Sequence, residues 1–331
     1  MHIWTDPAEV PESLTCSVVT IGNFDGVHRG HMALLDRVVK LAAAPDEPCM
    51  GVVMTFSPHP ATVHRPAFAP VPIMADEIKD IHCAEAGIDA VLRLNYTWEF
   101  AQQTPEEFIK NYVVDVLHAR AVVVGEDVRF GLDNAGDINV LRELGEKFGF
   151  EVVTLSDVGE QRRWSSTWVR EALQVGDVKS AAEVLGRNHR MYGTVVHGFA
   201  RGRELGFPTA NLSDDATGLM PADGVYAGWL IDEAGVWWPS AISIGTNPTF
   251  DGVVRVAEAF VMDRPEGEQI EEFNLYDQQV VLEFVDHLRP TVTYRGPEAL
   301  IEQMHVDVER AREILRGDAD ARPDVVKVAA G

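Results

Sequence analysis

Short apolar runs alternate with amphipathic segments along the first half of the chain. Strands are predicted where about four to eight mostly β-branched or apolar residues stand together, over Ser17–Ile21, Met50–Phe56, Val91–Leu94, Ala121–Val124 and Val152–Leu155. Helices are predicted where apolar residues recur at helical spacing, over Leu34–Leu41, Asp76–Gly87 and Pro105–Leu117. The strand–helix order predicts an α/β fold with a doubly wound parallel sheet.

The pattern changes near residue 186. Before it, one helix is predicted to follow Thr167 as its N-cap, and a second covers Val178–Leu185 and ends at Gly186. Beyond it come short strands separated by turn residues, over Met191–Val196, Gly224–Ile231, Trp237–Ile244, Val256–Val261 and Gln279–Val285. Helical spacing returns only over Pro297–Leu315. We therefore expect a small antiparallel β-barrel with a C-terminal helix, domains at 1–186 and 187–331, and a mobile tail over 316–331.

Composition supports two folded domains and limits the partners. The 331 residues are 46% hydrophobic and include 7 Trp and 14 Phe, enough for two cores, so global disorder is excluded. The net charge of −24 argues against nucleic acid as the main partner, because binding to its backbone needs a basic surface. An anionic substrate must therefore be met by local positive charge, helix ends or a metal.

The sequence also predicts a cellular location. Cys16, Cys49 and Cys83 fit no metal or redox spacing and are interpreted as ordinary thiols of a reducing compartment. The first ten residues lack the basic and apolar regions of a signal peptide. No apolar run approaches the ~20 residues of a membrane span. We expect a cytoplasmic protein with no membrane partner; the sequence leaves its oligomeric state unspecified.

Glycines and histidines follow the first predicted strand. Gly22 and Gly26 permit a tight turn, and the helix start beyond Gly30 aims free N–H groups at the loop, which suits phosphate. His28 and His31 stand three apart and can share one helix face, where two imidazoles can donate to one polyphosphate. The alternative is a common turn with two histidines that only cap or solvate the helix.

Three further groups lie where predicted strands or loops end. His59 stands between prolines at the carboxyl end of the second strand, where open α/β sheets bind ligands; the alternative is a proline-stiffened loop. Asp127 follows a strand and either holds a ribose or is solvated. Ser166 and Arg170 start a helix and can face a triphosphate together; the alternative is a simple cap.

The second half carries its own candidate chemistry. Glycines between His197 and Leu212 allow a loop to close over phosphates. Thr209 and Asn211 are two apart, so an extended chain presents both on one side, and their oxygens suit Mg²⁺. Glu283 is a lone glutamate on a predicted strand that could act as a base; the alternative is an outward polar position in an alternating strand.

Several longer strings occur in a familiar order. The first half contains GNFDGVHRGH, TFSPHP, VVGED and SSTWVR, and the second contains GRELGFPTANL, ADGVYAGW, GTNPTF and EFVDHLR. Over nearly its whole length the chain resembles the prokaryotic bifunctional riboflavin kinase/FAD synthetase family. The resemblance implies an HxGH nucleotidyltransferase-like first domain that transfers AMP from ATP to FMN, giving FAD and pyrophosphate. It implies a flavokinase-like second domain that phosphorylates riboflavin with ATP to give FMN.

The resemblance also implies residue roles. Catalytic roles fall to His28, His31, Ser166 and Arg170 in adenylyl transfer and to Glu283 as the base of the kinase. Contacts with ATP or FMN in the first domain are implied for Gly22, Phe24, Asp25, Gly26, Gly30, His59, Asp127, Ser165 and Thr167. Contacts with ATP or flavin in the second are implied for Gly198, Arg201, Gly202, Gly206, Pro208, Thr209 and Asn211, with Thr209 and Asn211 holding Mg²⁺.

Four departures from the family pattern and two other functions stay in view. The departures are Trp164 for a small aliphatic residue, Arg129 after Val128 where an aromatic is expected, Ala200 in the second-domain loop, and Asp277 after Tyr276. An adenylyltransferase with another acceptor would not need the PTAN-containing half. A flavin-binding sensor would not need an intact set of catalytic groups. A P-loop kinase is excluded, because GxxxxGK[ST] is not present. The lack of a strand followed by GxGxxG argues against a nicotinamide dehydrogenase.

Overall fold

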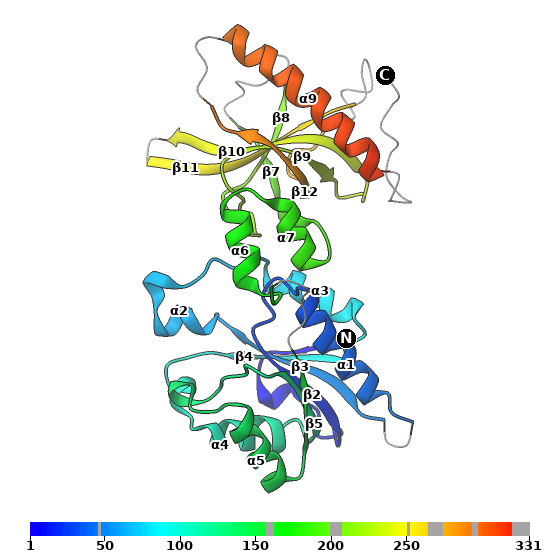
Figure 1. Cartoon of the computed structure of the whole chain (residues 1–331), viewed down its shortest axis with the longest axis vertical. Helices are drawn as coiled ribbons and strands as arrows, with labels where there is room; N and C mark the ends of the chain where they lie inside the picture. Colours follow the sequence, from blue (N-terminus) through cyan, green and yellow to red (C-terminus); the bar gives the residue numbers. More distant parts are fainter. Residues whose placement is uncertain are drawn as a thin grey trace. The chain divides into compact units, whose positions relative to one another are not determined.

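The chain folds as two compact units. The computed structural model describes residues 1–45, 48–156, 162–198, 207–249, 252–263, 274–292 and 297–319. The first unit is Met1–Ser166 and the second is Thr167–Gly331 (Figure 1). The expected boundary at residue 186 placed two helices in the first domain, α6 (Ser166–Gln174) and α7 (Val178–Leu185). In the structure both belong to the second unit, except for Ser166, the first residue of α6. Because α6 begins at Ser166, Thr167 lies in its first turn, and its prediction as N-cap is wrong.

The first unit contains the predicted doubly wound sheet. Its 6 strands run in the order β1-β4-β3-β2-β5-β6, and every neighbouring pair is parallel. Their bounds are β1 His2–Trp4, β2 Ser17–Ile21, β3 Met50–Ser57, β4 Ala90–Asn95, β5 Ala119–Gly125 and β6 Glu151–Leu155. The chain builds β3 and β4 on one side of β2 and then crosses to place β5 on the other. Crevices at such a switch point are where these sheets bind ligands.

Helices cover both faces of this sheet (Figure 1). Helices α1 (Arg29–Ala42) and α3 (Asp76–Glu85) pack over the core that holds Val18, and α4 (Pro105–Phe108) and α5 (Ile138–Phe148) over the core that holds Val19. Neighbouring residues of β2 thus enter opposite cores, as the alternation of a strand requires. The remaining elements of this unit are α2 Pro60–His64, a π-helical segment Ile109–Val114, and 3-10 turns at Pro7–Glu9, Pro66–Phe68, Phe100–Gln102 and Leu132–Asn134.

The cysteine prediction is wrong for two of the three residues. Cys16 and Cys49 form a disulfide, with Cα atoms 5.0 Å apart. They precede β2 and β3, which lie side by side, so the parallel pairing brings together two thiols that are distant in sequence. Cys83 is free and buried, and burial raises the pKa of its thiol to about 12.

The second unit is the predicted antiparallel barrel. It closes in the order β10-β11-β8-β7-β12-β9. The strands are β7 His189–Val196, β8 Thr209–Leu212, β9 Gly224–Ile231, β10 Trp237–Thr249, β11 Gly252–Val261 and β12 Gln279–Pro290. Cross-strand partners such as Ile242 and Tyr226 and their neighbours Ala259 and Ala210 are buried and form its interior.

Helix α9 (Pro297–Ala319) covers part of the outside of the barrel (Figure 1). Its buried Val308, Ala311 and Leu315 pack in one cluster with Trp229 of β9, whose indole N–H donates to Asp318 at 2.7 Å. The helix therefore extends past residue 316, where the tail was expected to begin; residues 320–331 lie outside the described part of the chain. None of the described helices has the length and apolar character of a membrane span.

Candidate functional site

A cavity opens at the switch point of the first unit, between the carboxyl ends of β2 and β5. Its volume is about 210 Å³. We call it the histidine cavity, and its lining residues include Gly22, His28, His31, Asp127 and Trp164. The structure thus brings together groups that the sequence analysis selected from segments distant along the chain.

The two histidines form one stacked pair at the start of α1. His28 is the N-cap of the helix, and its Nδ1 accepts a hydrogen bond from the backbone N–H of His31 at 3.3 Å. The two rings stack with centroids 3.7 Å apart. A Cβ on Gly30 would lie 3.0 Å from His28 Cε1, so a side chain there would push against the stacked ring. The glycine between the histidines therefore serves the geometry of the pair.

The loop before the pair is held by buried groups. The Asp25 carboxylate accepts the backbone N–H of Ile73 at 2.9 and 3.2 Å, and the Asp25 carbonyl accepts the Ser166 hydroxyl at 2.7 Å. Phe24 is buried beside His31, and Gly26 has a φ of 82°. The Asp25 side chain thus packs within the protein and shapes the loop, and Ser166 is tied to the same loop. The buried Phe24 is among the residues that line the histidine cavity.

Cations line or flank the histidine cavity. Arg163 pairs with Asp127 at 2.6 Å, and both side chains are substantially exposed. The Arg29 guanidinium lies over the Trp164 ring, 5.3 Å from its centroid. Asp127 and Trp164 stood out in the sequence, whereas Arg163 and Arg29 did not. The available signal was their position beside the motif residues in a strongly acidic chain.

Other predicted residues lie elsewhere in the described structure. His59 is the N-cap of α2, where its Nδ1 accepts the Ala61 N–H at 3.1 Å, and it is not among the lining residues of the histidine cavity. Ser165 stands between Trp164 and Ser166 at the end of the first unit. Thr167 and Arg170 belong to α6 and to the second unit, Thr167 exposed and Arg170 partly buried.

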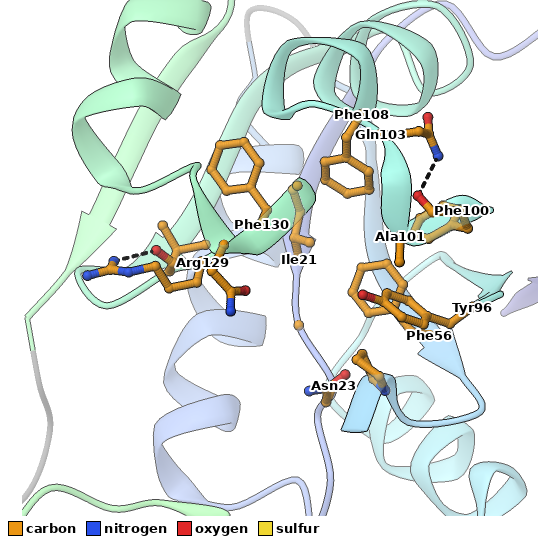
Figure 2. A pocket seen from close by; sticks show the side chains of 15 residues that line it. Ile21, Asn23, Phe56, Tyr96, Phe100, Ala101, Gln103, Phe108, Arg129 and Phe130 are labelled. Carbon is orange, nitrogen blue, oxygen red and sulfur yellow. Dashed lines mark hydrogen bonds between the residues drawn. The ribbon is translucent and has the colours of Figure 1, made fainter. Parts of the chain in front are cut away.

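A second cavity, of about 300 Å³, lies in the same unit. We call it the aromatic cavity, because its lining includes the rings of Phe56, Tyr96, Phe100, Phe108 and Phe130. Figure 2 shows Phe56 and Tyr96 together on one side and Phe108 and Phe130 together on another.

The two cavities adjoin. Ile21, Gly22 and Val128 line both of them. Arg129 also lines the aromatic cavity, on the side away from Tyr96 in Figure 2. The aromatic cavity could not be predicted from the sequence, because its rings are spread from residue 56 to residue 130 and look like core residues.

In the barrel, β8 and β11 place three oxygen-bearing side chains together. Asn211 lies opposite Glu258 in the register. The Thr209 hydroxyl donates to Glu258 Oε2 at 3.3 Å, and the Asn211 amide lies 3.3 Å from that hydroxyl. Thr209 and Asn211 were predicted from the sequence, whereas Glu258 was not, because its only signal was an acid in a mostly apolar strand.

Glu283 of β12 has different surroundings. Only 1% of the residue is exposed, and its carboxylate accepts from Arg190 Nε at 2.7 Å and from Asn188 Nδ2 at 2.9 Å. Burial acts to lower the pKa of Arg190, but the charge and hydrogen bond of Glu283 outweigh it, so this pKa is raised. Glu283 is thus the buried partner in an ion pair with Arg190, whose side chain is partly exposed.

The loop before β8 is described only at its ends. A Cβ on Gly198 would lie 2.5 Å from Asn211 Nδ2, so the missing side chain gives Asn211 room. Pro208 directly precedes β8 and is partly buried. Arg201, Gly202 and Gly206, together with the departure at Ala200, lie outside the described residues.

The donor set beside Thr209 fits a hard cation. The Thr209 hydroxyl and the Asn211 amide carbonyl are oxygen ligands, which Mg²⁺ prefers when substrate phosphates and waters supply the rest. The Glu258 carboxylate beside them adds negative charge. Within the described ranges no group of three or more His, Cys, Asp or Glu side chains could hold a metal ion.

Comparison with known proteins covers both units. A family model described as FAD synthetase matches residues 10–168, and one described as Riboflavin kinase matches residues 185–315. A bifunctional riboflavin kinase/FMN adenylyltransferase of Pseudomonas fluorescens is 35% identical over 311 residues, 93% of this chain and 96% of that protein. The Escherichia coli K12 protein of the same name is 33% identical over 299 residues, 90% of this chain and 92% of its own. The chain belongs to the bifunctional riboflavin kinase/FMN adenylyltransferase family.

The family assignment confirms the resemblance inferred from the motifs. The chain carries its FAD synthetase domain first and its riboflavin kinase domain second. A solved structure titled as a macrolide-efflux protein from Streptococcus pneumoniae aligns with a TM-score of 0.81 at 30% identity, covering 94% of this chain and 98% of that one. The histidine and aromatic cavities lie in the first domain. Thr209, Asn211 and Glu258, which we call the Thr209 cluster, lie in the second.

Proposed function

We propose that the chain converts riboflavin to FAD in two steps, each in its own domain. The second domain transfers the terminal phosphate of ATP to the ribityl hydroxyl of riboflavin and gives FMN. The first domain transfers AMP from a second ATP to FMN and gives FAD and pyrophosphate. The observation that carries adenylyl transfer is the pair of adjoining cavities in the first domain, one suited to polyphosphate and one to a flat aromatic ligand. The kinase step is supported by the oxygen-bearing side chains of Thr209, Asn211 and Glu258 in the second domain.

In adenylyl transfer, the histidine cavity holds the triphosphate. His28 and His31 donate to phosphate oxygens at the start of α1, where the free N–H groups add positive potential. The attacking phosphate of FMN is already anionic, so the reaction needs alignment and stabilisation of charge at phosphorus and on the departing pyrophosphate. Ser166, whose hydroxyl donates to the Asp25 carbonyl in the same unit, is proposed to contribute to this charge stabilisation. The role implied for Arg170 stays a prediction from the sequence.

The aromatic cavity is proposed to hold the isoalloxazine ring of FMN. Offset and edge-on ring contacts suit a flat heteroaromatic ligand. Because Gly22 lines both cavities, a flavin there would have its phosphate tail directed toward ATP. This arrangement would bring nucleophile and electrophile together without a strong base.

In the kinase domain, Thr209 and Asn211 are proposed to hold Mg²⁺ and ATP. The ion would neutralise charge on the transferred phosphate. Glu258 is better supported as the base for the ribityl hydroxyl than Glu283, because Glu258 contacts Thr209 whereas Glu283 is buried against Arg190. A base has to reach the hydroxyl whose proton it removes.

Two further expectations, on the cellular location and on the domain boundary, complete the proposal. We place the enzyme in the cytoplasm, since both steps consume ATP. We retain 186/187 as the functional boundary between the domains; the first family model ends at residue 168 and the second begins at residue 185, close to this position.

The test is a timed incubation of the purified chain with riboflavin, Mg²⁺ and ATP, followed by separation of the flavins. FMN should appear first and FAD later. Omitting Mg²⁺ with a chelator present should stop FMN formation. A flavin sensor would bind riboflavin unchanged, and an adenylyltransferase with another acceptor would make neither product.

A further inference from the structure

A polar clamp lies behind one wall of the aromatic cavity. His64, the last residue of α2, joins Tyr96, the first residue after β4, through a hydrogen bond of 2.8 Å between Nε2 and the phenol oxygen. Trp98 packs its ring edge-on against His64, with centroids 5.8 Å apart. His64 thus touches two aromatic rings of the segment between β4 and η3 (Phe100–Gln102).

Tyr96 is the member of this clamp that reaches the cavity. Its ring lies edge-on to Phe56, 5.7 Å between centroids, and tilted against Phe100 at 5.2 Å. All three rings line the aromatic cavity, and Figure 2 shows Tyr96 and Phe56 together at its wall. Burial raises the pKa of the phenol, so the hydroxyl is neutral and bonds to the imidazole as a neutral group.

The two ends of the clamp come from different segments. Pro60 at the start of α2 lines the aromatic cavity, and the Tyr96 N–H donates to the carbonyl of Ser57 at 3.0 Å. The backbone therefore ties the two segments at one end, and the His64 hydrogen bond ties them again at the far end of α2. A ring held from both sides keeps one orientation, which lowers the entropy lost when a flat ligand packs against it.

We propose that His64 is a positioning residue for the flavin: by holding Tyr96, it fixes the wall of the aromatic cavity against which the isoalloxazine ring of FMN packs. The inference rests on the proposed use of this cavity for flavin. His64 is not among the lining residues of the histidine cavity, where the reacting phosphates are proposed to bind. Its loss should therefore weaken FMN binding and leave ATP binding and the chemical step unchanged.

The experiment measures KM for FMN, KM for ATP and kcat of adenylyl transfer in the full chain. His64→Ala should raise KM for FMN about 2- to 10-fold, the range that corresponds to one neutral hydrogen bond. The KM for ATP and kcat should stay within about twofold of the wild type, because the bond that is lost lies outside the proposed phosphate site. The rate of FMN formation from riboflavin, which uses the other domain, reports that the variant is folded.

Three further variants separate positioning from a general structural role. His64→Gln, whose amide can reach the place of Nε2, should recover much of the lost affinity. Tyr96→Phe keeps the ring and removes the hydroxyl, so it should match His64→Ala. The double variant His64→Ala/Tyr96→Phe should raise KM for FMN no more than either single variant does, because both substitutions remove the same hydrogen bond. Phe68→Ala is the matched control. Phe68 lies in the 3-10 turn that follows α2, its side chain is 83% exposed, and it lines neither cavity.

Phe56→Ala distinguishes the two ways of failing. If Phe56→Ala raises KM for FMN but His64→Ala does not, the positioning role is overturned and the flavin cavity stands. If Phe56→Ala also leaves KM for FMN unchanged, the aromatic cavity is not the flavin site. Both the proposed flavin site and the positioning role of His64 are then overturned. Additive effects in the double variant, or equal changes in both KM values, would likewise overturn the role of His64.

Discussion

Glu258 and Glu283 show how surroundings decide what one residue type can do. Both glutamates occupy strands of the same barrel. Glu258 contacts the hydroxyl of Thr209 and lies in register with Asn211, so it adjoins the oxygen cluster proposed for Mg²⁺. Glu283 is fixed by Arg190 and Asn188 in a nearly fully buried position. The first arrangement suits proton transfer, and the second suits structural pairing of charges.

This difference predicts opposite phenotypes. Glu258→Gln should lower the rate of FMN formation by at least about 100-fold, the contribution of a positioned general base, with the melting temperature nearly unchanged. Glu283→Gln should lower the melting temperature, because it removes the charge paired with Arg190. Rates measured below the melting point distinguish the two. An inactive but fully stable Glu283→Gln protein would return the role of base to Glu283.

His189 predicts a pH-dependent loss of stability. The residue is buried, its Nε2 lies 2.6 Å from the Leu219 carbonyl, and burial lowers its pKa to about 4. The unfolded chain binds a proton below about pH 6.5, whereas the folded chain does not until about pH 4. The free energy of unfolding therefore suffers no loss from His189 above about pH 6.5. It falls as the pH drops, by about 2 kcal/mol at pH 5.

Comparison with a non-titrating variant isolates this contribution. His189→Gln keeps a side-chain N–H for Leu219 and loses the titration. Urea unfolding followed by tryptophan fluorescence at about pH 7.5 and about pH 5, on either side of the unfolded pKa, should show a smaller drop for the variant. All other titrating groups act equally in both proteins, so parallel pH curves would contradict the assignment.

At the scale of elements, the sequence predicted those whose local pattern is complete. The apolar runs predicted β2 and β9 with their observed bounds, and the helical spacing predicted α7 with its bounds. Helix α5 is an exception, since it was missed although it has 11 residues, Asp137 as its N-cap and Gly149 as its C-cap. The short strands β1 and β8 were missed because they have little local signal and are completed by the sheet edge and the barrel closure. The disulfide was missed for the same reason, since only the β2–β3 pairing brings Cys16 to Cys49.

Barrel closure depends on a glycine in β9. A Cβ on Gly228 would lie 2.2 Å from the Glu283 carbonyl of β12 and 2.5 Å from Ile242 Cδ1 of β10. Gly228→Ala should therefore push apart the β9–β12 pair and destabilise the kinase domain by about 1–3 kcal/mol. Gly317→Ala on α9 is the control, because nothing lies within 4 Å of its Cβ position and alanine favours a helix. Equal unfolding midpoints of the two variants would contradict the packing argument.

At the scale of the whole molecule, the motifs located each activity but not each complete site. The string around His28 and His31 and the one around Thr209 lie where the structure gathers polar groups. The sequence could not predict the aromatic cavity, Arg163 or Glu258, because their place depends on strands that pair across long separations. A motif names the residues of one loop, whereas a cavity collects residues from several.

Because each domain carries its own set of groups, the two activities should be separable and then recombinable. The double variant His28→Ala/His31→Ala should turn riboflavin into FMN and stop there, because it keeps the Thr209 cluster. Glu258→Gln should make FAD only when FMN is supplied, because it keeps both cavities of the first domain. Mixed with riboflavin, ATP and Mg²⁺, the two proteins should make FAD after a lag in which free FMN accumulates, since FMN is a small, soluble anion. Liquid chromatography of timed samples would follow all three flavins. A mixture that stops at FMN, although each protein keeps its remaining activity, would mean that FMN has to pass between the two domains of one chain.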